Sequence, residues 1–195
     1  MNKKIILLVI FVLVAIAQLY VPAKMIWDKE EVIETGNVYL FETAPIDPTD
    51  PFRGKYITLS FVDDRYKVTD NTQWQSGEHI YVSITKNATG VASIESVSKT
   101  RPNSGLDYFQ ASVRYVTGAE EPTLTIEFPF DRYYMEESKA YEAEVVYRES
   151  RRDTSVTAYA VVKVKAGQSV LEDVMINGIS IREVVKSNRE TGVTK

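Results

Sequence analysis

Residues 45 to 61 read Pro-Ile-Asp-Pro-Thr-Asp-Pro-Phe-Arg-Gly-Lys-Tyr-Ile-Thr-Leu-Ser-Phe, and this stretch constrains the backbone more than any other part of the chain. Pro45, Pro48 and Pro51 each fix φ, remove an amide donor and push the preceding residue towards an extended conformation. Asp47 and Asp50 favour turns in which a carboxylate accepts a nearby backbone amide. We therefore expect a stiff loop that no helix can cross.

A β-strand is predicted directly after this loop, at residues 55–61. These residues are rich in β-branched and aromatic side chains, which favour strands. Alternation along the strand places Lys55, Ile57, Leu59 and Phe61 on one face. We expect the apolar members of this set to lie in a core.

The composition indicates one folded domain with an anchor. Of the 195 residues, 44% are hydrophobic and 26% are charged, which suits a globular chain. No cysteine is present, so stability must come from the burial of a core and not from disulfides or thiolate metal sites. Without Lys3, Lys4 and Lys24 the chain has 20 basic and 27 acidic residues, a net charge of −7. Nucleic acid is therefore not an expected partner, because phosphate binding needs clustered basic residues.

The N-terminal segment predicts a membrane anchor over residues 1–27. From residue 5 to residue 21 the only polar interruptions are Gln18 and Tyr20, and a thinly polar extension reaches Trp27. This length is at the lower limit for a helix that spans a bilayer, and Tyr20 and Trp27 suit aromatic anchors at the membrane interface. The membrane is thus the first expected partner.

The basic residues before the apolar segment favour an N-terminus in the cytoplasm. We therefore expect a single-pass protein of the cytoplasmic (inner) membrane, with its C-terminal domain outside the cytoplasm. A cleaved signal peptide is the alternative, because Ala15-Ile16-Ala17 has the small-x-small pattern of a cleavage site. Both interpretations export the domain.

The remainder divides into a charged stalk at 28–36, a β-rich domain at 37–187 and a polar tail at 188–195. The stalk is expected to continue the anchor as a helix that Gly36 ends. The first strand, at 38–43, is apolar on both faces, and we expect both faces to be covered. From residue 186 onward the chain is polar and is expected to fray.

The body of the chain predicts a mostly β, α+β fold, a sandwich or barrel with one short helix. Strands are expected at 80–84, 91–99, 108–115, 123–128 and 155–165. The helix is expected at 136–149, with Tyr141, Val145 and Arg148 on one stripe. Asn177-Gly178, inside residues 171–181, is typical of a type I′ turn and predicts a terminal hairpin.

Two blocks of residues resemble the signature of the GDYXXLXY family, membrane-anchored bacterial proteins without an assigned activity. The first block is Asp47-Pro48-x-Asp50 followed by Arg53-Gly54-Lys55-Tyr56-x-x-Leu59-x-Phe61. The second is Arg132-Tyr133-Tyr134-Met135-x-Glu137, which resembles the family's Arg-Tyr-aromatic segment. The likeness extends from the anchor to about residue 182. It implies an anchored, extracytoplasmic domain beside other membrane proteins of the cell envelope.

This sequence departs from the family pattern at two positions. Lys55 stands where the family name has Asp, and Phe61 stands where it has Tyr. An ammonium in place of a carboxylate reverses the charge and turns an acceptor into a donor. A role that needs the family's Asp as a ligand or general base is therefore not expected here.

The candidate surface for a ligand or partner consists of Asp47, Asp50, Arg53, Tyr56, Arg132 and Tyr133. A guanidinium can hold a carboxylate in a two-point contact while it stacks on a ring. We hypothesise that the proline loop and the Arg132–Tyr133 segment meet in space. The alternative is that both arginines are buried and satisfy loop carbonyls.

No catalytic residue, cofactor or metal is expected. His79 is the only histidine and stands at a strand start, where a solvent-edge role is expected. Ser60 with Lys55 or Lys86 has the residue types of a Ser/Lys hydrolase, but no motif supports it. The leading interpretation is a non-enzymatic accessory protein that docks with another membrane protein. The alternatives are a small-ligand-binding module at the proline loop and an unrecognised hydrolase.

Overall fold

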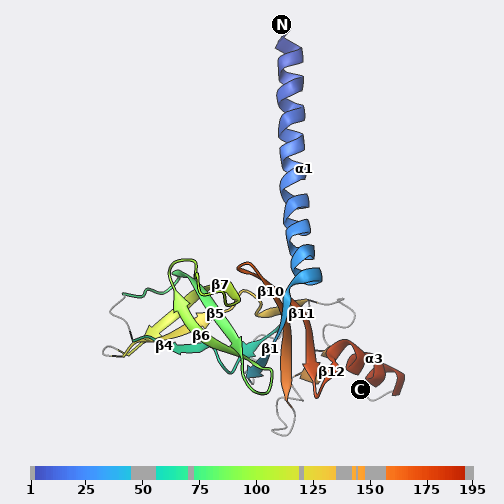
Figure 1. The fold of residues 1–195 in the computed structure, drawn as a ribbon. Coiled ribbons are helices and arrows are strands. Elements are labelled where there is room, and N and C mark those ends of the chain that lie inside the picture. Colours follow the sequence, from blue (N-terminus) through green and yellow to red (C-terminus); the bar gives the residue numbers. More distant parts are fainter. Residues whose placement is uncertain are drawn as a thin grey trace.

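The computed structural model describes residues 3–44, 56–69, 73–118, 121–134, 142–143, 145–147 and 157–191. Figure 1 shows one long helix, α1 (Lys3–Thr35), standing on a β-rich body. In chain order the body contains β1 (Asn37–Ala44), β2 (Tyr56–Thr58), β3 (Ser60–Phe61), β4 (Arg65–Lys67), β5 (His79–Lys86), β6 (Ala92–Ser98), β7 (Tyr108–Thr117), β8 (Thr123–Glu127), β9 (Arg132–Tyr134), β10 (Ala158–Lys165), β11 (Gln168–Ile176), β12 (Ile179–Ser180) and α3 (Ile181–Thr191).

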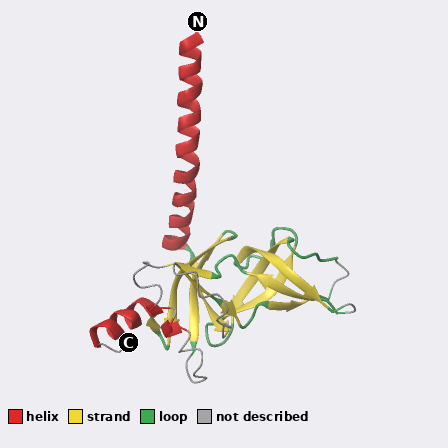
Figure 2. Cartoon of the chain, turned by 180° about the vertical axis from the view of Figure 1, so that it is seen from behind, coloured by secondary structure: helices red, strands yellow, loops and turns green. Residues whose placement is uncertain are grey.

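The described strands form two five-stranded sheets and one two-stranded ladder (Figure 2). The stem sheet, with the order β12-β11-β10-β1-β3, lies at the foot of α1. The barrel sheet has the order β4-β8-β7-β5-β6, and β2 and β9 form a separate hydrogen-bonded ladder. The expectation of an apolar N-terminal helix followed by a mostly β domain is confirmed.

The barrel sheet is nearly closed, and side chains complete the closure between its first and last strands. The Tyr66 hydroxyl on β4 donates to the Glu95 carbonyl on β6 at 3.3 Å. The backbone amide of Ile94, also on β6, donates to Asp63 Oδ2 at 3.2 Å. We call this junction the β4–β6 seam.

A cluster of phenylalanine rings joins the two sheets. Its members are Phe41 on β1, Phe61 on β3, Phe109 on β7, and Phe128 and Phe130 between β8 and β9. The ring centroids of Phe41 and Phe130 are 5.0 Å apart, and those of Phe109 and Phe128 are 5.4 Å apart in an edge-to-face arrangement. Aromatic pairs prefer such geometries, so the cluster fixes how the sheets pack as well as burying area.

The strand predicted at 55–61 is divided between two different partners. β2 pairs with β9, whereas β3 pairs with β1, and the amide of Leu59 between them donates to the Asp131 carbonyl at 2.7 Å. The predicted alternation still holds, because Ile57, Leu59 and Phe61 are all buried. The core-facing pattern was therefore right, while the single strand was wrong.

The expectation that β1 is covered on both faces holds only in part. Tyr39, Phe41 and Thr43 are buried, but Val38 is 41% exposed. β1 pairs with β10 through residues 37–42 and with β3 through residues 43–44, and its second face is half-buried from Leu40 to Ala44. Buried residues therefore alternate with half-buried ones along most of this strand.

The terminal hairpin is confirmed. β11 pairs with β12 across Asn177 and Gly178, which have φ values of 50° and 81°. Positive φ at both central residues is what a type I′ turn requires. The Asn-Gly pair was thus a reliable sign of local structure.

The hairpin leads into a helix that replaces part of the predicted polar tail. α3 includes residues 186–191, which we expected to fray. Ile181 and Val185 are buried, because residues four apart share one face of a helix. The Ser180 hydroxyl accepts the Arg182 amide at 3.2 Å and so caps the first turn.

The helix predicted at 136–149 is seen where the chain is described, at residues 142–143 and 145–147. Its buried side chains are Ala143 and Tyr147, while Val145 is only half-buried. The predicted stripe through Val145 is therefore wrong by half a turn. Tyr141 and Arg148 lie outside the described residues.

Helix α1 passes into β1 without a linker. The Gly36 amide donates to the Val32 carbonyl at 2.9 Å, and the helix ends at Thr35, as the sequence predicts. A β-carbon at Gly36 would overlap the Val32 carbonyl oxygen and lie 3.2 Å from that of Val164. Only glycine therefore lets the chain enter the sheet so close to the helix.

Polar contacts fasten the same end of α1 to the stem sheet. Lys165 Nζ on β10 lies 2.7 Å from Glu31 Oε1 and 2.7 Å from Thr35 Oγ1. The Val32 side chain is 3% exposed and is packed against the body. The last turns of α1 and the stem sheet are thus one packed unit.

Candidate binding cleft beside Arg132

The β2–β9 ladder brings together the two sequence blocks that suggested a shared site. In its register Tyr56 is opposite Tyr134, Ile57 is opposite Tyr133, and Thr58 is opposite Arg132. The strand that follows the proline loop therefore lies beside the Arg-Tyr-Tyr segment. Asp47, Asp50 and Arg53 lie outside the described residues.

The ladder has one exposed and one buried face. Tyr56, Thr58, Arg132 and Tyr134 share the outer face, because opposite residues in an antiparallel pair project to the same side. The rings of Tyr56 and Tyr134 are 5.3 Å apart, and the Arg132 guanidinium lies 5.1 Å from the Tyr56 ring centre. Tyr134 is 61% exposed. The outer face is thus an aromatic surface with one cation on it.

Arg132 is an accessible cation. Its side chain is 49% exposed, and its Nε lies 3.9 Å from Asp131 Oδ1. A hydrogen bond with Tyr134, helped by the negative potential of Tyr56 and Asp131, raises the pKa of Arg132 above its usual value. The alternative that Arg132 is sealed inside the domain therefore does not apply.

Tyr133 faces the opposite way and has a structural role. It is 2% exposed, and its hydroxyl donates to Asp173 Oδ1 at 2.8 Å. The hydroxyl oxygen of Tyr133 also accepts a hydrogen bond of 2.6 Å from Arg182 Nε. Burial, followed by the hydrogen bond to Asp173, raises the pKa of Tyr133 to about 12. This residue ties the ladder to β11 and α3.

A cleft opens next to Arg132, where the chain leaves β8 after Glu127. Its volume is about 320 Å³. It is lined by His79, Gln110, Ala111, Ser112, Glu127, Phe128, Pro129, Asp131 and Arg132. Its lining combines polar and charged side chains with the apolar Ala111, Phe128 and Pro129, a combination that can orient a polar organic ligand.

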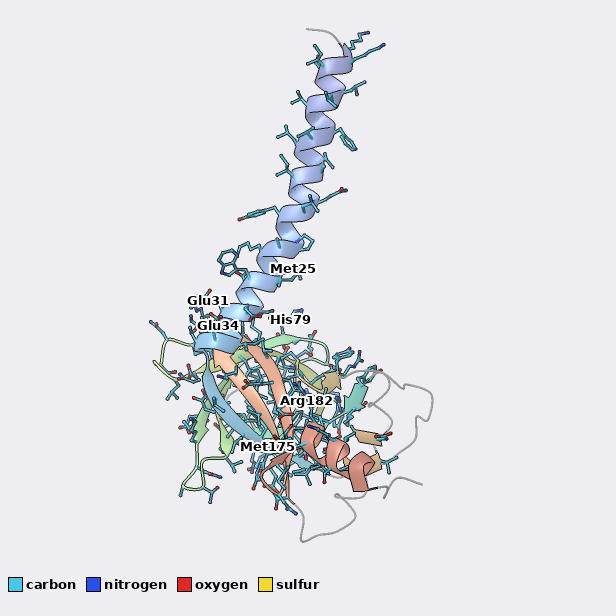
Figure 3. The ribbon with its side chains drawn as sticks, turned by 90° about the vertical axis from the view of Figure 1, so that its right-hand side faces the viewer. Met25, Glu31, Glu34, His79, Met175 and Arg182 are labelled. Atoms are coloured by element: carbon cyan, nitrogen blue, oxygen red, sulfur yellow. The ribbon has the colours of Figure 1, made fainter. Side chains whose placement is uncertain are left out.

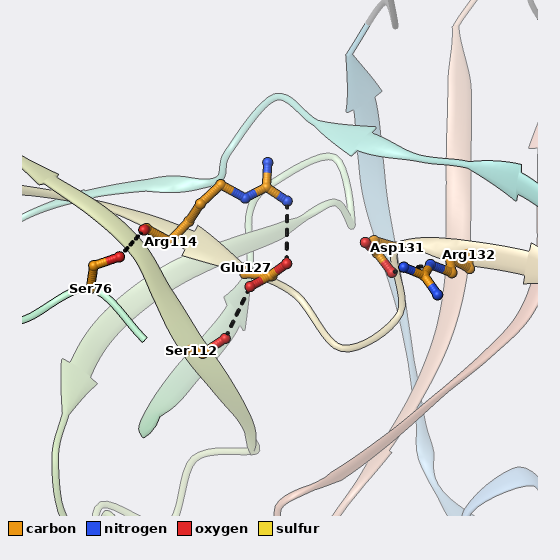
Figure 4. Close-up of polar contacts among 6 residues, drawn as sticks. All are labelled: Ser76, Ser112, Arg114, Glu127, Asp131 and Arg132. Atoms are coloured by element: carbon orange, nitrogen blue, oxygen red, sulfur yellow. Dashed lines mark hydrogen bonds and ion pairs between the residues drawn. The ribbon is translucent and has the colours of Figure 1, made fainter. Parts of the chain in front are cut away.

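Sheet register places three of these side chains in one row. Ser112 on β7 is opposite His79 on β5 and opposite Glu127 on β8. The Ser112 hydroxyl donates to Glu127 Oε2 at 3.4 Å, and Arg114 Nη2 lies 3.8 Å from Glu127 Oε1 (Figure 4). The carboxylate of Glu127 is therefore held between a hydroxyl and a guanidinium.

This row does not have the geometry of a nucleophilic triad. In a triad the imidazole accepts the serine proton and the carboxylate orients the imidazole. Here the carboxylate contacts the serine instead, and His79 is exposed at the start of β5. Within the described ranges, no three His, Asp or Glu side chains gather as metal ligands would.

A model of the GDYXXLXY protein family matches residues 18–174. The chain belongs to this family. Comparison with curated proteins and with solved structures finds no match.

The GDYXXLXY signature has two kinds of residue in this structure. Leu59 and Phe61 are buried, and Phe61 belongs to the phenylalanine cluster. Tyr56 is half-buried on the outer face of the ladder. Among the described signature residues, Tyr56 is thus the one whose side chain remains partly accessible.

Several residues that line the cleft of this GDYXXLXY protein were not predicted from the sequence. Gln110, Ser112 and Glu127 come from two strands whose register cannot be read from local sequence. Arg182 was also missed, although Ser180 followed by Glu183 has the spacing of a capping box and predicts a helix start there.

Proposed function

We propose that this GDYXXLXY protein is a single-pass accessory protein of the bacterial cell envelope. Its β domain lies outside the cytoplasm and docks with another membrane protein, without catalysing a reaction. One observation carries the proposal: α1 is packed directly against the stem sheet, so the body has a fixed orientation to the helix. A body held in one orientation to the helix can present the same surface to a neighbouring membrane protein, which a domain on a flexible linker cannot.

The exposure of α1 supports an anchor in the membrane. The helix is long and apolar enough to cross a bilayer, and none of its most apolar window is buried by the body. Leu7, Phe11 and Leu19 are 67%, 68% and 74% exposed. In water this apolar surface would be strongly unfavourable, whereas lipid covers it.

The same exposure favours an uncleaved anchor over a cleaved signal peptide. Cleavage after Ala17 would leave Leu19, Ile26 and Trp27 on the mature chain, and these side chains are 74%, 69% and 77% exposed. The helix they belong to is continuous with the part that packs on the body. Retention of the whole helix in the bilayer covers them. Lys3 and Lys4 then favour a cytoplasmic N-terminus.

A capture experiment tests docking. The full chain is crosslinked in native membranes and isolated, beside a variant with a short Gly/Ser insertion between Thr35 and Gly36. The insertion keeps the anchor and the domain but removes their fixed orientation. We expect a specific membrane partner with the parent chain and its loss with the insertion. Equal capture by both chains would show that the fixed junction has no part in docking.

A second candidate function is the binding of a small polar ligand in the cleft. The observation that favours it is the accessible Arg132 guanidinium at the edge of a cleft of about 320 Å³. Ligand screening by melting shift on the full chain in detergent tests it, with Arg132→Ala and Arg114→Ala compared. A ligand whose shift is lost only in Arg132→Ala supports this function. A shift that survives in both variants contradicts the role of Arg132.

A further inference from the structure

The end of the body nearest to α1 contains the connection between β6 and β7, residues 99–107. Asn37, the first residue of β1, donates from its side-chain amide to Asp107 Oδ2 at 2.7 Å. The Tyr39 hydroxyl donates to the same oxygen at 2.9 Å. These bonds hold the connection beside the foot of α1.

The β10–β11 turn lies at the same end. The Gln110 amide donates to the Gly167 carbonyl at 3.1 Å, and the Tyr108 ring packs under Gly167. Figure 1 shows this turn, in orange, rising to the level of the last turn of α1. Figure 3 shows Met175 towards the end of the body away from α1. The end of the domain that contains residues 99–107 and the β10–β11 turn therefore lies on the same side of the body as α1.

This end has an open depression with one unneutralised cation. Its volume is about 430 Å³, and its lining includes Arg101, Leu106 and Tyr108. The Arg101 guanidinium lies 5.6 Å from the Tyr108 ring centre. In the part of the chain that the structure describes, no carboxylate forms an ion pair with it. Leu106 is 38% exposed beside it.

The length of the helix sets the distance between this surface and the lipid. Trp27, at the end of the apolar part of α1, and Thr35, at its foot, are separated by about 12 Å along the helix axis. The polar headgroup layer fills roughly 5 to 8 Å of such a distance on each side of a bilayer. Projecting loops and a long arginine side chain can span the remaining distance between the headgroup layer and the body.

We infer that residues 99–107 face the bilayer and that Arg101 binds the phosphate of a phospholipid headgroup. This inference rests on the proposed membrane anchoring. The Tyr108 ring packs against the Arg101 guanidinium, and Leu106 contacts the interfacial zone of the bilayer. Glu30 and Glu34 on the stalk are exposed acids that oppose a general attraction to anionic lipid. The contact is therefore local and does not follow from net charge.

Single-cysteine labelling tests the orientation, because the chain has no cysteine of its own. Leu106→Cys and Ile179→Cys are labelled with a fluorophore in the full chain and reconstituted into phosphatidylcholine vesicles that carry a headgroup nitroxide. Ile179 is the matched control, since it is an apolar residue, 50% exposed, in the hairpin at the far end of the body. We expect strong quenching at residue 106 and little at residue 179. Equal quenching at both positions would overturn the inference.

A second arm tests Arg101 itself. The label at residue 106 is compared in phosphatidylcholine vesicles and in vesicles that also contain phosphatidylglycerol, with and without Arg101→Gln. One basic residue near the surface changes local anionic-lipid occupancy about five-fold, so Arg101→Gln should remove most of the added quenching. Unchanged quenching in Arg101→Gln would refute headgroup binding by this residue.

Extraction of the same vesicles at alkaline pH separates the two proposals. Release of the chain from the lipid would mean that the proposed anchoring fails. Retention of the chain without quenching at residue 106 would mean that anchoring holds and the lipid-facing surface does not.

Discussion

The Tyr133 hydroxyl donates a hydrogen bond of 2.8 Å to Asp173, and this bond joins β9 to β11. It links the second sequence block of the family to the C-terminal part of the domain. Because Arg182 Nε donates to the same hydroxyl, one oxygen connects the ladder, the stem sheet and α3. The stability of the closing part of the fold should therefore depend on this single atom.

Tyr133→Phe tests that dependence. The substitution leaves Asp173 and Arg182 without their shared partner, so we expect the free energy of unfolding to fall by about 1–3 kcal/mol. Tyr134→Phe is the matched control, because Tyr134 is 61% exposed, and it should change stability by less than about 0.5 kcal/mol. Chemical unfolding of the full chain in detergent, followed by tryptophan fluorescence, measures both. Similar effects of the two variants would contradict the structural role of Tyr133.

The domain should lose stability at alkaline pH. Burial raises the pKa of Tyr133 and that of Tyr39 to about 12, above the unfolded value of about 10. A raised pKa means that the protonated phenol stabilises the fold fully below about pH 10, and that this contribution is lost as pH rises towards 12. Stability curves measured between pH 8 and pH 12 should fall above pH 10. In the double variant Tyr39→Phe, Tyr133→Phe the fall should be much smaller; an unchanged fall would point to other groups.

The phenylalanine cluster should control how the two sheets hold together. Phe109 is 0% exposed and contacts rings from β1 and from the β8–β9 connection. Phe109→Ala should cost about 3–5 kcal/mol, while Phe109→Leu should cost less because it leaves a smaller cavity. Tyr115→Ala, at a side chain 45% exposed, is the control and should be nearly neutral. A small effect of Phe109→Ala would show that the sheets do not depend on this cluster.

Two glycines should respond to alanine for different reasons. Gly36→Ala places a β-carbon against the Val32 carbonyl, so the junction must shift, and we expect a cost of about 2 kcal/mol or more. Gly178→Ala meets no neighbour, and its cost of about 1–2 kcal/mol comes from positive φ alone. Hydrogen exchange separates the two cases. Faster exchange at residues 29–37 is expected only for Gly36→Ala, and its absence would mean that the helix is not held by this close approach.

Local patterns in the sequence predicted much of the fold. Alternation placed Ile57, Leu59 and Phe61 in the core, and all three are buried. These predictions succeeded because the two faces of a strand differ in polarity whatever its partner is. The Asn-Gly turn succeeded for the same reason, since its backbone geometry is local.

Partnership between distant strands could not be predicted in this way. The division of the 55–61 segment depends on β9 and β1, which are far away in the chain, and nothing in the segment itself names these partners. The cleft was out of reach for the same reason, because Ser112 meets His79 and Glu127 only through sheet register. Tyr56 and Arg132 both belonged to the hypothesised surface and lie close together, while the burial of Tyr133 among Asp173 and Arg182 depends on contacts between distant strands.

The β4–β6 seam has a consequence for contacts between neighbouring copies of this chain. An edge strand with free amides and carbonyls invites pairing with the same strand of a neighbouring copy. At the seam, Asp63 accepts the Ile94 amide and Tyr66 donates to the Glu95 carbonyl, so side chains of the same molecule already satisfy these groups. The Ile94 amide and the Glu95 carbonyl on β6 are therefore not free to pair with a strand of a neighbouring copy.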